Sequence, residues 1–153
     1  MINLQIINVD NKNIKDVEKF LLQTDTIVEI EKDILELGYI LKNDEKDEIV
    51  GFITYEKYSE YGLIRYFIFQ KTIASYYIFE MFEKLKEKAV NNNIESFIAI
   101  AKNKEVVELF QKLDFYDISN SNFLINGQKI IGTDLEDAVI FKHDLNNLEQ
   151  KQA

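Results

Sequence analysis

An apolar run over residues 94–101 leads directly into a helical pattern over residues 103–113, and this succession limits the folds open to the chain. Only Glu95 and Ser96 interrupt the run, as expected of a strand inside a sheet with both faces covered. Asn103 can cap the helix that follows. The inward stripe of that helix consists of Val106, Leu109, Phe110 and Leu113. A buried strand that leads into an amphipathic helix indicates a mixed α/β domain.

Hydrophobic periodicity predicts the remaining elements and places them in a single domain over residues 1–146, followed by a flexible tail over residues 147–153. Strands are predicted at residues 1–9, 39–42, 49–58, 61–69, 123–125, 129–131 and 138–142. Helical stripes run through residues 14–21, 27–37 and 78–89. Asn13 is the predicted cap of the first of these helices, and Gly38 is the predicted stop of the second. Tight turns are predicted at residues 59–60 and 126–127.

Composition and charge exclude several classes of protein. The chain has 153 residues, of which 46% are hydrophobic, and this suits one globular domain with its own core. The net charge of −9 argues against a nucleic-acid partner, because phosphate binding needs clustered Lys and Arg. No apolar run approaches the roughly 20 residues of a membrane span. The absence of cysteine excludes disulfides and thiolate metal sites and predicts a cytoplasmic protein.

The segment from Asn103 to Phe115 resembles the GNAT superfamily of N-acetyltransferases, which usually has N-x-x-A-x-x-L-Y-x-K-L-G-F here. The chain reads N-K-E-V-V-E-L-F-Q-K-L-D-F, so that Phe110 stands in the tyrosine position and Asp114 in the glycine position. Residues 139–145 also resemble the last strand of that family. The resemblance implies a central, mostly antiparallel sheet flanked by helices, with the fourth and fifth strands splayed apart.

The resemblance also implies a binding site for acetyl-CoA. In the family, the pantetheine arm lies along the fourth strand, and the diphosphate lies on a glycine-containing loop at the start of the next helix. Tyr76 and Ile78 stand where the family has glycines, so two bulky side chains are expected at the mouth of this loop. The residues implied to contact the cofactor are Phe67, Ile68, Phe69, Ile73, Ala74, Ser75, Tyr76, Tyr77, Ile78, Asn103 and Phe110.

Candidate catalytic residues are few. Phe110 cannot donate the proton that the family's tyrosine gives to the departing thiolate, and its position on an inward stripe favours a core role. Tyr116 is the candidate substitute acid, although an aromatic at an exposed edge has the same signature. Glu56 is the candidate base, with a solvated strand face as the alternative. Water can also relay the proton.

Other catalytic or metal constellations find no support. His143 is the single histidine and has no suitable partners for a triad or a metal site, and the acidic run at residues 44–48 lacks the spacing of a calcium loop.

Two functions follow from these patterns. The first is transfer of an acetyl group from acetyl-CoA to a small-molecule or peptide amine, by direct attack of the amine. The second is a catalytically degenerate GNAT-fold protein that acts as a ligand-binding, protein-binding or regulatory module. The sequence leaves the acceptor unidentified and a homodimer open, and it predicts neither a nucleic-acid nor a membrane partner.

Overall fold

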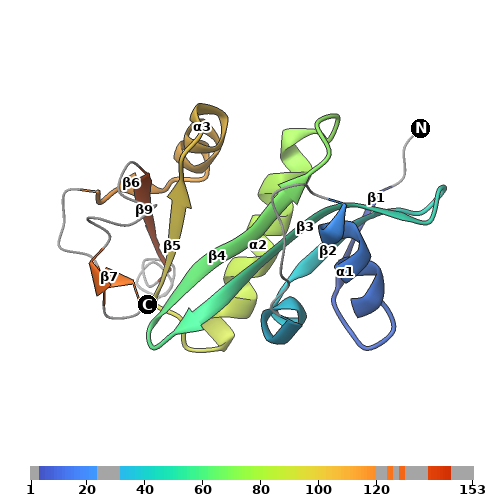
Figure 1. The fold of residues 1–153 in the computed structure, drawn as a ribbon, viewed down its shortest axis with the longest axis horizontal. Coiled ribbons are helices and arrows are strands. Elements are labelled where there is room, and N and C mark those ends of the chain that lie inside the picture. The colour runs from blue at the N-terminus through green and yellow to red at the C-terminus, as the bar shows by residue number, and fades with distance from the viewer. Residues whose placement is uncertain (1–3, 24–31, 120–123, 126–127, 130–137, 146–153) are drawn as a thin grey trace, which may run out of the picture. The chain divides into compact units, whose positions relative to one another are not determined.

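The structure is a computed structural model that describes residues 4–23, 32–119, 124–125, 128–129 and 138–145 (Figure 1). In chain order the elements are β1 (Leu4–Asn8), α1 (Ile14–Leu22), the 3-10 helix η1 (Lys32–Leu37), β2 (Tyr39–Asn43), β3 (Glu48–Tyr58), β4 (Tyr61–Phe69), α2 (Ser75–Asn91), β5 (Ser96–Ala101), α3 (Lys104–Lys112), β6 (Tyr116–Asp117), β7 (Leu124–Ile125), β8 (Gln128–Lys129) and β9 (Val139–Asp144).

Within the described residues, seven strands form one sheet in the order β1-β2-β3-β4-β5-β9-β6, and β7 pairs with β8. The pairing of β4 with β5 is parallel, whereas β1–β2, β2–β3, β5–β9 and β6–β9 are antiparallel. The predicted mixed fold with a mostly antiparallel sheet is therefore confirmed.

The chain forms two compact units. The first unit comprises Met1–Glu56 and Arg65–Ala89, and the second comprises Lys57–Ile64 and Val90–Ala153. Strand β4 thus gives its first residues to the second unit and its last residues to the first. The single domain over residues 1–146 remains a prediction.

The first unit contains an apolar cluster between its first helices and strands. Its fully buried members come from α1, η1, β2 and β3, and they are Val17, Leu21, Leu35, Ile40 and Phe52. The spacing of Val17 and Leu21 puts both side chains on one face of α1, as the sequence predicts. Of the predicted second helix, the described part is the 3-10 helix η1, and the remainder lies outside the described residues.

One local prediction in the first unit is confirmed and one is corrected. Helix η1 ends at Leu37, directly before the predicted stop Gly38, and Gly38 also allows close packing, since a Cβ there would lie 2.5 Å from the carbonyl oxygen of Ile53. Asn13 holds the N-cap position of α1, but its side chain makes no cap hydrogen bond. Its Oδ1 instead accepts from the Asp10 N–H at 2.8 Å, and its Nδ2 donates to the Asn8 carbonyl at 2.9 Å, so it closes the loop after β1.

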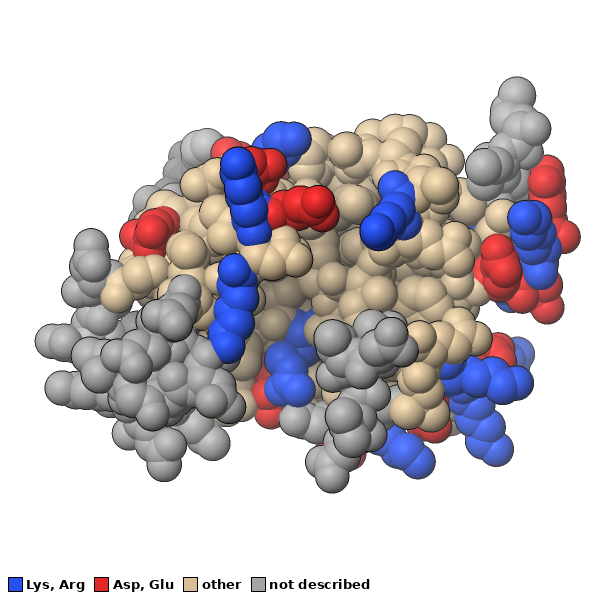
Figure 2. Space-filling view, turned by 45° about the horizontal axis from the view of Figure 1, so that its top comes forward, with Lys and Arg blue, Asp and Glu red and all other residues tan. Residues whose placement is uncertain are grey.

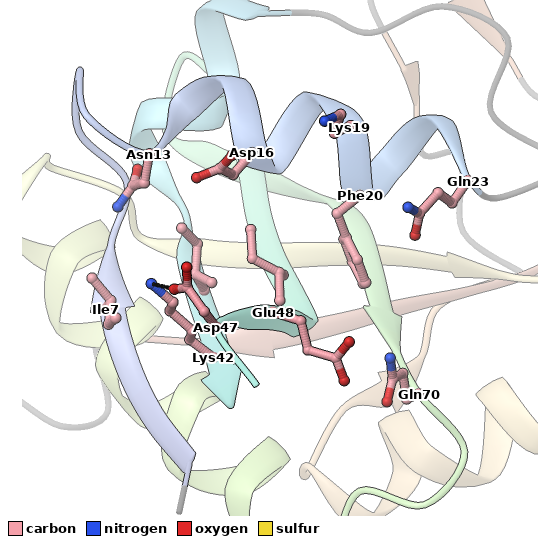
Figure 3. A pocket seen from close by; sticks show the side chains of 12 residues that line it. Ile7, Asn13, Asp16, Lys19, Phe20, Gln23, Lys42, Asp47, Glu48 and Gln70 are labelled. Carbon is pink, nitrogen blue, oxygen red and sulfur yellow. Dashed lines mark ion pairs between the residues drawn. The ribbon is translucent and has the colours of Figure 1, made fainter. Parts of the chain in front are cut away.

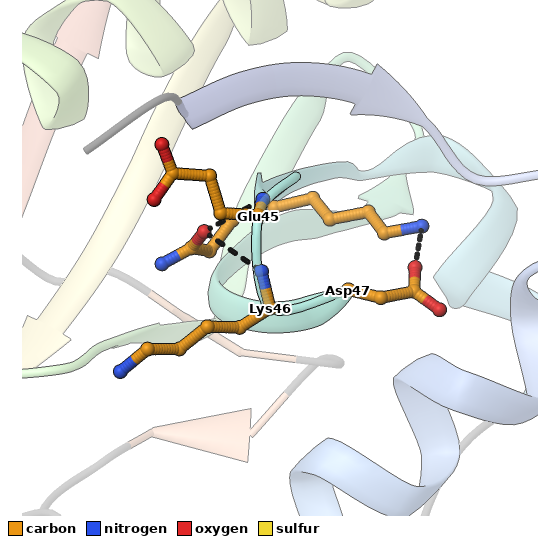
Figure 4. Close-up of polar contacts among 5 residues, drawn as sticks. Glu45, Lys46 and Asp47 are labelled. Atoms are coloured by element: carbon orange, nitrogen blue, oxygen red, sulfur yellow. Dashed lines mark hydrogen bonds and ion pairs between the residues drawn. The ribbon is translucent and has the colours of Figure 1, made fainter. Parts of the chain in front are cut away.

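The acidic run between β2 and β3 forms a hydrogen-bonded turn (Figure 4). The Asn43 side-chain oxygen accepts from the N–H groups of Glu45 and Lys46, at 3.1 and 3.3 Å. Lys42 pairs with Asp47 at 2.6 Å, and Asp47 has a φ of 51°. The acidic run thus forms a charged turn between two paired strands. Among the described residues, no group of three or more His, Cys, Asp or Glu residues is arranged to hold a metal ion.

The second unit contains β5, α3, β6 and β9. Asn103 caps α3, with its Oδ1 accepting from the Val106 N–H at 3.1 Å. Phe110 is 3% exposed, and its ring lies 5.0 Å from that of Phe115 and 6.1 Å from that of Phe141. The structure thus supports the core interpretation of Phe110. Strand β9 pairs with all six residues of β5 and is longer than predicted.

Asn93, in the turn after α2, has a left-handed φ of 65°. The hairpin residues 126–127 lie outside the described residues, as does the tail over residues 147–153. The flanking pairs Leu124↔Lys129 and Ile125↔Gln128 are antiparallel, as that hairpin requires.

Figure 2 shows basic and acidic side chains interspersed on the face drawn, without a continuous basic patch there. None of the helices in the described residues is long and apolar enough to cross a membrane.

Candidate functional site

Strand β4 pairs with β5 over only part of its length. The parallel register comprises Tyr61↔Ser96, Gly62↔Phe97 and Leu63↔Ile98, all within the second unit. Strand β4 continues to Phe69, but the described residues show no β4–β5 pair after Leu63. The backbone groups at the end of β4 are therefore not used in a ladder with β5, which is the splaying that the sequence resemblance implies.

Tyr66 marks the change in β4. Its φ of 53° is in the left-handed region, which is unusual for a bulky residue within a strand. Such a conformation persists only where the surroundings hold it. The Tyr66 ring packs against the first unit's core, with its centroid 6.5 Å from that of Phe52, and the Arg65 guanidinium carbon lies 5.4 Å from the ring centre. From Arg65 onward every side chain of β4 is half-buried.

The predicted arm-binding residues Phe67, Ile68 and Phe69 follow this change. The rings of Phe67 and Phe69 meet edge to face at 5.2 Å, so these two side chains share one side of the strand. Ile68 packs on the opposite side against the core. Phe69 covers Gly51, where a Cβ would lie 2.4 Å from the ring. All three residues are thus held by packing within the first unit.

The predicted phosphate loop leads into the N-terminus of α2. The Gln70 N–H donates to the Val50 carbonyl at 2.9 Å, and the Ile73 N–H donates back to the Gln70 carbonyl at 3.1 Å. Helix α2 starts at Ser75, and its first turn contains no acidic side chain. The first N–H groups of a helix lack intrahelical acceptors and favour an anion. Ile73 and Ala74 therefore lie in the loop, directly before a helix end suited to phosphate.

Tyr76, Tyr77 and Ile78 lie inside α2 and not in the loop before it. The Tyr76 side chain is 60% exposed, and its ring centre lies 4.1 Å from that of Tyr77. A side-chain hydrogen bond with Tyr77 is the largest cause of the raised pKa of Tyr76. Ile78 is half-buried. The bulky residues expected at the mouth of the loop thus form the first turn of the helix.

Glu56, the candidate base, is held in an ion pair on β3. Its Oε1 accepts from Arg65 Nη1 at 2.7 Å, and the two side chains are 23% and 29% exposed. The Glu56 carboxylate is thus held by Arg65, which fits neither a freely solvated side chain on the strand face nor an unengaged base. Arg65 is the chain's single arginine, and the sequence reasoning gave it no role.

Tyr116, the candidate acid, lies on β6 in the second unit. Its hydroxyl donates to Asp144 Oδ2 at 2.7 Å. Partial burial, and then the hydrogen bond to Asp144 and its charge, raise the pKa of Tyr116 from the ordinary 10.0 to about 12. A phenol with a raised pKa gives up its proton less readily. The environment of Tyr116 therefore weakens it as an acid.

Titration of Tyr116 tests this environment. We expect Tyr116→Phe to leave the tyrosinate absorbance unchanged up to about pH 11, because the Tyr116 phenol stays protonated there. Asp144→Asn should lower the pKa of Tyr116 and restore a signal in that range. Folding raises the pKa of Tyr116, so the protonated phenol contributes fully to the stability of the folded protein below pH 10. This contribution is lost as the pH rises through about 12. Normal titration of Tyr116 near its ordinary pKa would contradict the geometry.

A polar cavity of about 350 Å³ lies in the first unit between α1 and strands β1 to β3 (Figure 3). Phe20 points into it from α1, and Lys42 and Asp47 pair at its edge. Its lining carries charges of both signs and several amides, and it includes Asn13, Asp16, Lys19, Gln23, Glu48 and Gln70. None of the predicted site residues lines this cavity.

The predicted site residues are divided between the two units. Phe67 to Ile78 and Glu56 belong to the first unit, whereas Asn103, Phe110 and Tyr116 belong to the second. Sequence reasoning missed the left-handed Tyr66 and the Glu56–Arg65 pair. No local signal predicts a positive φ at a tyrosine, but the single arginine nine positions after a strand glutamate, across a tight turn, could have indicated a cross-strand pair.

No family model matches the sequence, and no curated protein matches it. Solved structures share its fold, and three of them are compared with it. An N-acetylglutamate synthase from Neisseria gonorrhoeae, complexed with coenzyme A and L-arginine, aligns with 92% of this chain and 33% of its own, at 14% identity and a TM-score of 0.71. The chain thus spans about a third of that synthase.

An acetyltransferase of the GNAT family from Staphylococcus aureus aligns over 94% of this chain and 99% of its own, at 15% identity and a TM-score of 0.67. A mutant spermidine/spermine N-acetyltransferase, SpeG from Vibrio cholerae, aligns over 98% of both chains, at 9% identity and a TM-score of 0.64. The parted β4–β5 ladder and these alignments agree: this chain has the GNAT acyltransferase fold.

Proposed function

We propose that this protein is a GNAT-type N-acetyltransferase that takes acetyl-CoA as co-substrate and acetylates an amine. The observation that carries this proposal is the β4–β5 ladder, which ends after Leu63↔Ile98 although β4 continues to Phe69. A strand edge that leaves its ladder is a place where an extended, amide-containing arm can add as a further strand.

The first unit contains features suited to both ends of such a cofactor. The backbone of Phe67, Ile68 and Phe69 would hold the pantetheine amides. The start of α2, after the loop that ends at Ala74, would hold the diphosphate through backbone N–H groups, and its first turn has no carboxylate to repel it. Lys71 is exposed in that loop and supplies a positive charge. The residues therefore fit acetyl-CoA, with most of the recognition coming from the backbone.

The chemistry is a direct transfer. Bound acetyl-CoA would supply a thioester at whose carbonyl carbon the amine nitrogen forms a C–N bond while the C–S bond breaks, the thiolate taking the proton that the nitrogen loses. Glu56 would act through water, because Arg65 already binds its carboxylate. Asn103 would cap α3 and contact the cofactor arm, and Tyr116 would remain the candidate acid.

The neighbouring structures support the cofactor and the reaction type. One was solved with coenzyme A, and another is a spermidine/spermine N-acetyltransferase. From these structures we infer only the reaction class for this chain, which is acetyl transfer to a small amine or a peptide amine. A cytoplasmic location and a homodimer remain predictions.

A second candidate function is a GNAT-fold module that has lost catalysis. Phe110 favours it, because a phenylalanine in the core cannot donate a proton. The engaged hydroxyl of Tyr116 favours it as well. In this case the fold would bind a regulatory ligand or a protein partner without turnover.

Calorimetric titration of the full chain with acetyl-CoA tests the proposal, followed by an assay for free thiol in the presence of amines. We expect micromolar affinity. Binding without thiol release would favour the degenerate module, and absence of binding would overturn both the cofactor and the enzyme.

Tyr76→Gly combined with Ile78→Gly tests the position of the phosphate site. We expect tighter acetyl-CoA binding, because removing both side chains opens the backbone at the first turn of α2 to the diphosphate. The change will also cost about 1 kcal/mol of helix stability per glycine, so affinity is compared well below the unfolding temperature. Tyr76→Ala with Ile78→Ala is the matched control for side-chain loss. Unchanged affinity in both variants would show that the diphosphate binds elsewhere.

A further inference from the structure

A second cavity, of about 390 Å³, lies in the second unit. It is formed by the β3–β4 turn, the start of β4, and strands β5, β6 and β9 with their adjoining residues. Its lining consists of Glu60, Tyr61, Glu95, Ser96, Ile98, Tyr116, Ile118 and Lys142. This volume lies within the range of small-molecule sites. None of these residues except Tyr116 belongs to the site predicted from the sequence.

The cavity adjoins the place where the β4–β5 ladder ends. Tyr61 and Ser96 form the first pair of that ladder, and Ile98 belongs to the last pair, with Leu63. The floor residue Ile98 is 1% exposed and clusters with Leu63 and Ile140. The cavity therefore extends along the paired part of β4 and β5, with Glu60 and Glu95 at the start of the ladder.

The walls of the cavity are aromatic and aliphatic. The Tyr61 ring stacks on that of Tyr58, with centroids 5.4 Å apart and an interplanar angle of 21°. Ile118 packs against the same apolar cluster as Ile98. Tyrosine rings attract organic cations, and aliphatic side chains suit a methylene chain.

Two glutamates bring unbalanced charge to the rim. The Glu95 N–H donates to the Glu60 carbonyl at 2.7 Å, so the two residues are neighbours across the sheet. Like charges on neighbouring strands repel one another. In the described part of the chain, neither carboxylate takes part in an ion pair or a side-chain hydrogen bond, and both residues are exposed.

The one cation in the lining has its own partner. Lys142 Nζ lies 3.6 Å from Asp144 Oδ1, and the other oxygen of Asp144 accepts from Tyr116. Asp144 thus balances Lys142, and the charge left in the cavity is that of Glu60 and Glu95. The cavity is therefore negative, aromatic and partly apolar.

We propose that this cavity binds an alkyl diamine or polyamine, with one ammonium group on Glu60 and Glu95 and the methylene chain against the apolar wall. The two carboxylates select a protonated amine, and the aromatic and aliphatic walls favour one that carries an alkyl chain. A diamine keeps a second polar end for the rest of the rim, which a monoamine of the same length lacks.

Calorimetric titration of the full chain with putrescine, without acetyl-CoA, tests the site itself. Butylamine is the matched monoamine, and the variants are Glu60→Gln, Glu95→Gln and the double variant. Glu45→Gln, at an exposed carboxylate in the β2–β3 turn, is the matched control. We expect putrescine to bind more tightly than butylamine, and the double variant to weaken putrescine binding by about tenfold while Glu45→Gln leaves it unchanged.

Three results would overturn the proposal: no putrescine binding by the wild type, equal affinity for putrescine and butylamine, or the same affinity in the Glu60→Gln/Glu95→Gln variant. Circular dichroism of each variant shows whether it is folded. Tyr61→Leu provides a second test, because it removes the aromatic wall and keeps both carboxylates. We expect this variant to lose putrescine affinity. Acetyl-CoA is titrated separately. Putrescine binding without acetyl-CoA binding would disprove the proposed enzyme and leave the cation site standing, and the reverse would disprove only the cation site.

Discussion

Replacing Phe52 with alanine is expected to lower the free energy of unfolding by about 3–5 kcal/mol. Phe52 is fully buried on β3 and belongs to the apolar cluster of the first unit. Its ring also lies 6.5 Å from that of Tyr66, so the substitution removes packing that holds Tyr66 in its left-handed conformation. Since a domain of this size has only about 5–15 kcal/mol of stability, the loss is a large part of the total.

Urea denaturation followed by circular dichroism measures this loss. Leu22→Ala is the matched control, because Leu22 is 60% exposed and its truncation should change stability by no more than about 0.5 kcal/mol. If Phe52→Ala does not fold, Phe52→Leu gives a smaller cavity and a measurable fraction of the effect. A loss no greater than that of Leu22→Ala would show that Phe52 is not central to the core.

Replacing Gly38 with alanine is expected to destabilise the protein by about 1–3 kcal/mol or more, although the change adds a single methyl group. The new Cβ would lie 2.5 Å from the Ile53 carbonyl oxygen and 2.8 Å from two atoms of the Phe52 ring. That oxygen belongs to the backbone of β3, where Ile53 is the register partner of Tyr39, so it cannot move without disturbing the β2–β3 pairing.

Gly51→Ala is the matched control for Gly38→Ala. A Cβ at Gly51 would also be too close, 2.4 Å from an atom of Phe69, but the obstacle there is a half-buried side chain that can turn away. We therefore expect a smaller loss of stability from Gly51→Ala than from Gly38→Ala in thermal melting. Equal losses would mean that the backbone at Ile53 yields as easily as the Phe69 ring.

Much of the fold could be predicted because local patterns and tertiary packing agree. The apolar run at residues 94–101 is buried as β5, and the helix after it starts at the Asn103 cap, because burial and capping are both encoded locally. The same holds for the stripe of α2, whose buried residues Met81, Phe82, Leu85 and Ala89 follow the helical period.

Other features could not be predicted, because they depend on contacts between distant segments. Gly38 has the sequence signature of a helix stop, yet its smallness serves the approach of β3, which the local sequence does not encode. Asn13 has the signature of a helix cap, but its side chain is used by Asp10 and Asn8. In both cases the residue type indicated a special local role, but the sequence did not reveal which residues it contacts.

The candidate site shows the same division. Spacing along the chain placed Ile73 and Ala74 in the loop before α2, but it also assigned to that loop the residues from Ser75 to Ile78, which belong to the helix. The partner of Glu56, the hydrogen bond of Tyr116 and the glutamate-rimmed cavity all arise from strands that meet only in the folded chain. Periodicity in one sequence does not contain such cross-strand information.

The backbone at Tyr66 also restricts any redesign of β4. In the described part of the chain, four other non-glycine residues have positive φ, namely Asp47, Ser59, Asn93 and Asp114, and all four are small or polar residues in turns. Tyr66 is the exception, within a strand. Valine and isoleucine, ordinarily favoured in strands, are therefore poor choices at this position, while glycine suits the torsion angle but gives up the packing of the ring. Anyone who engineers this chain should choose residue 66 by its backbone angle before its hydrophobicity.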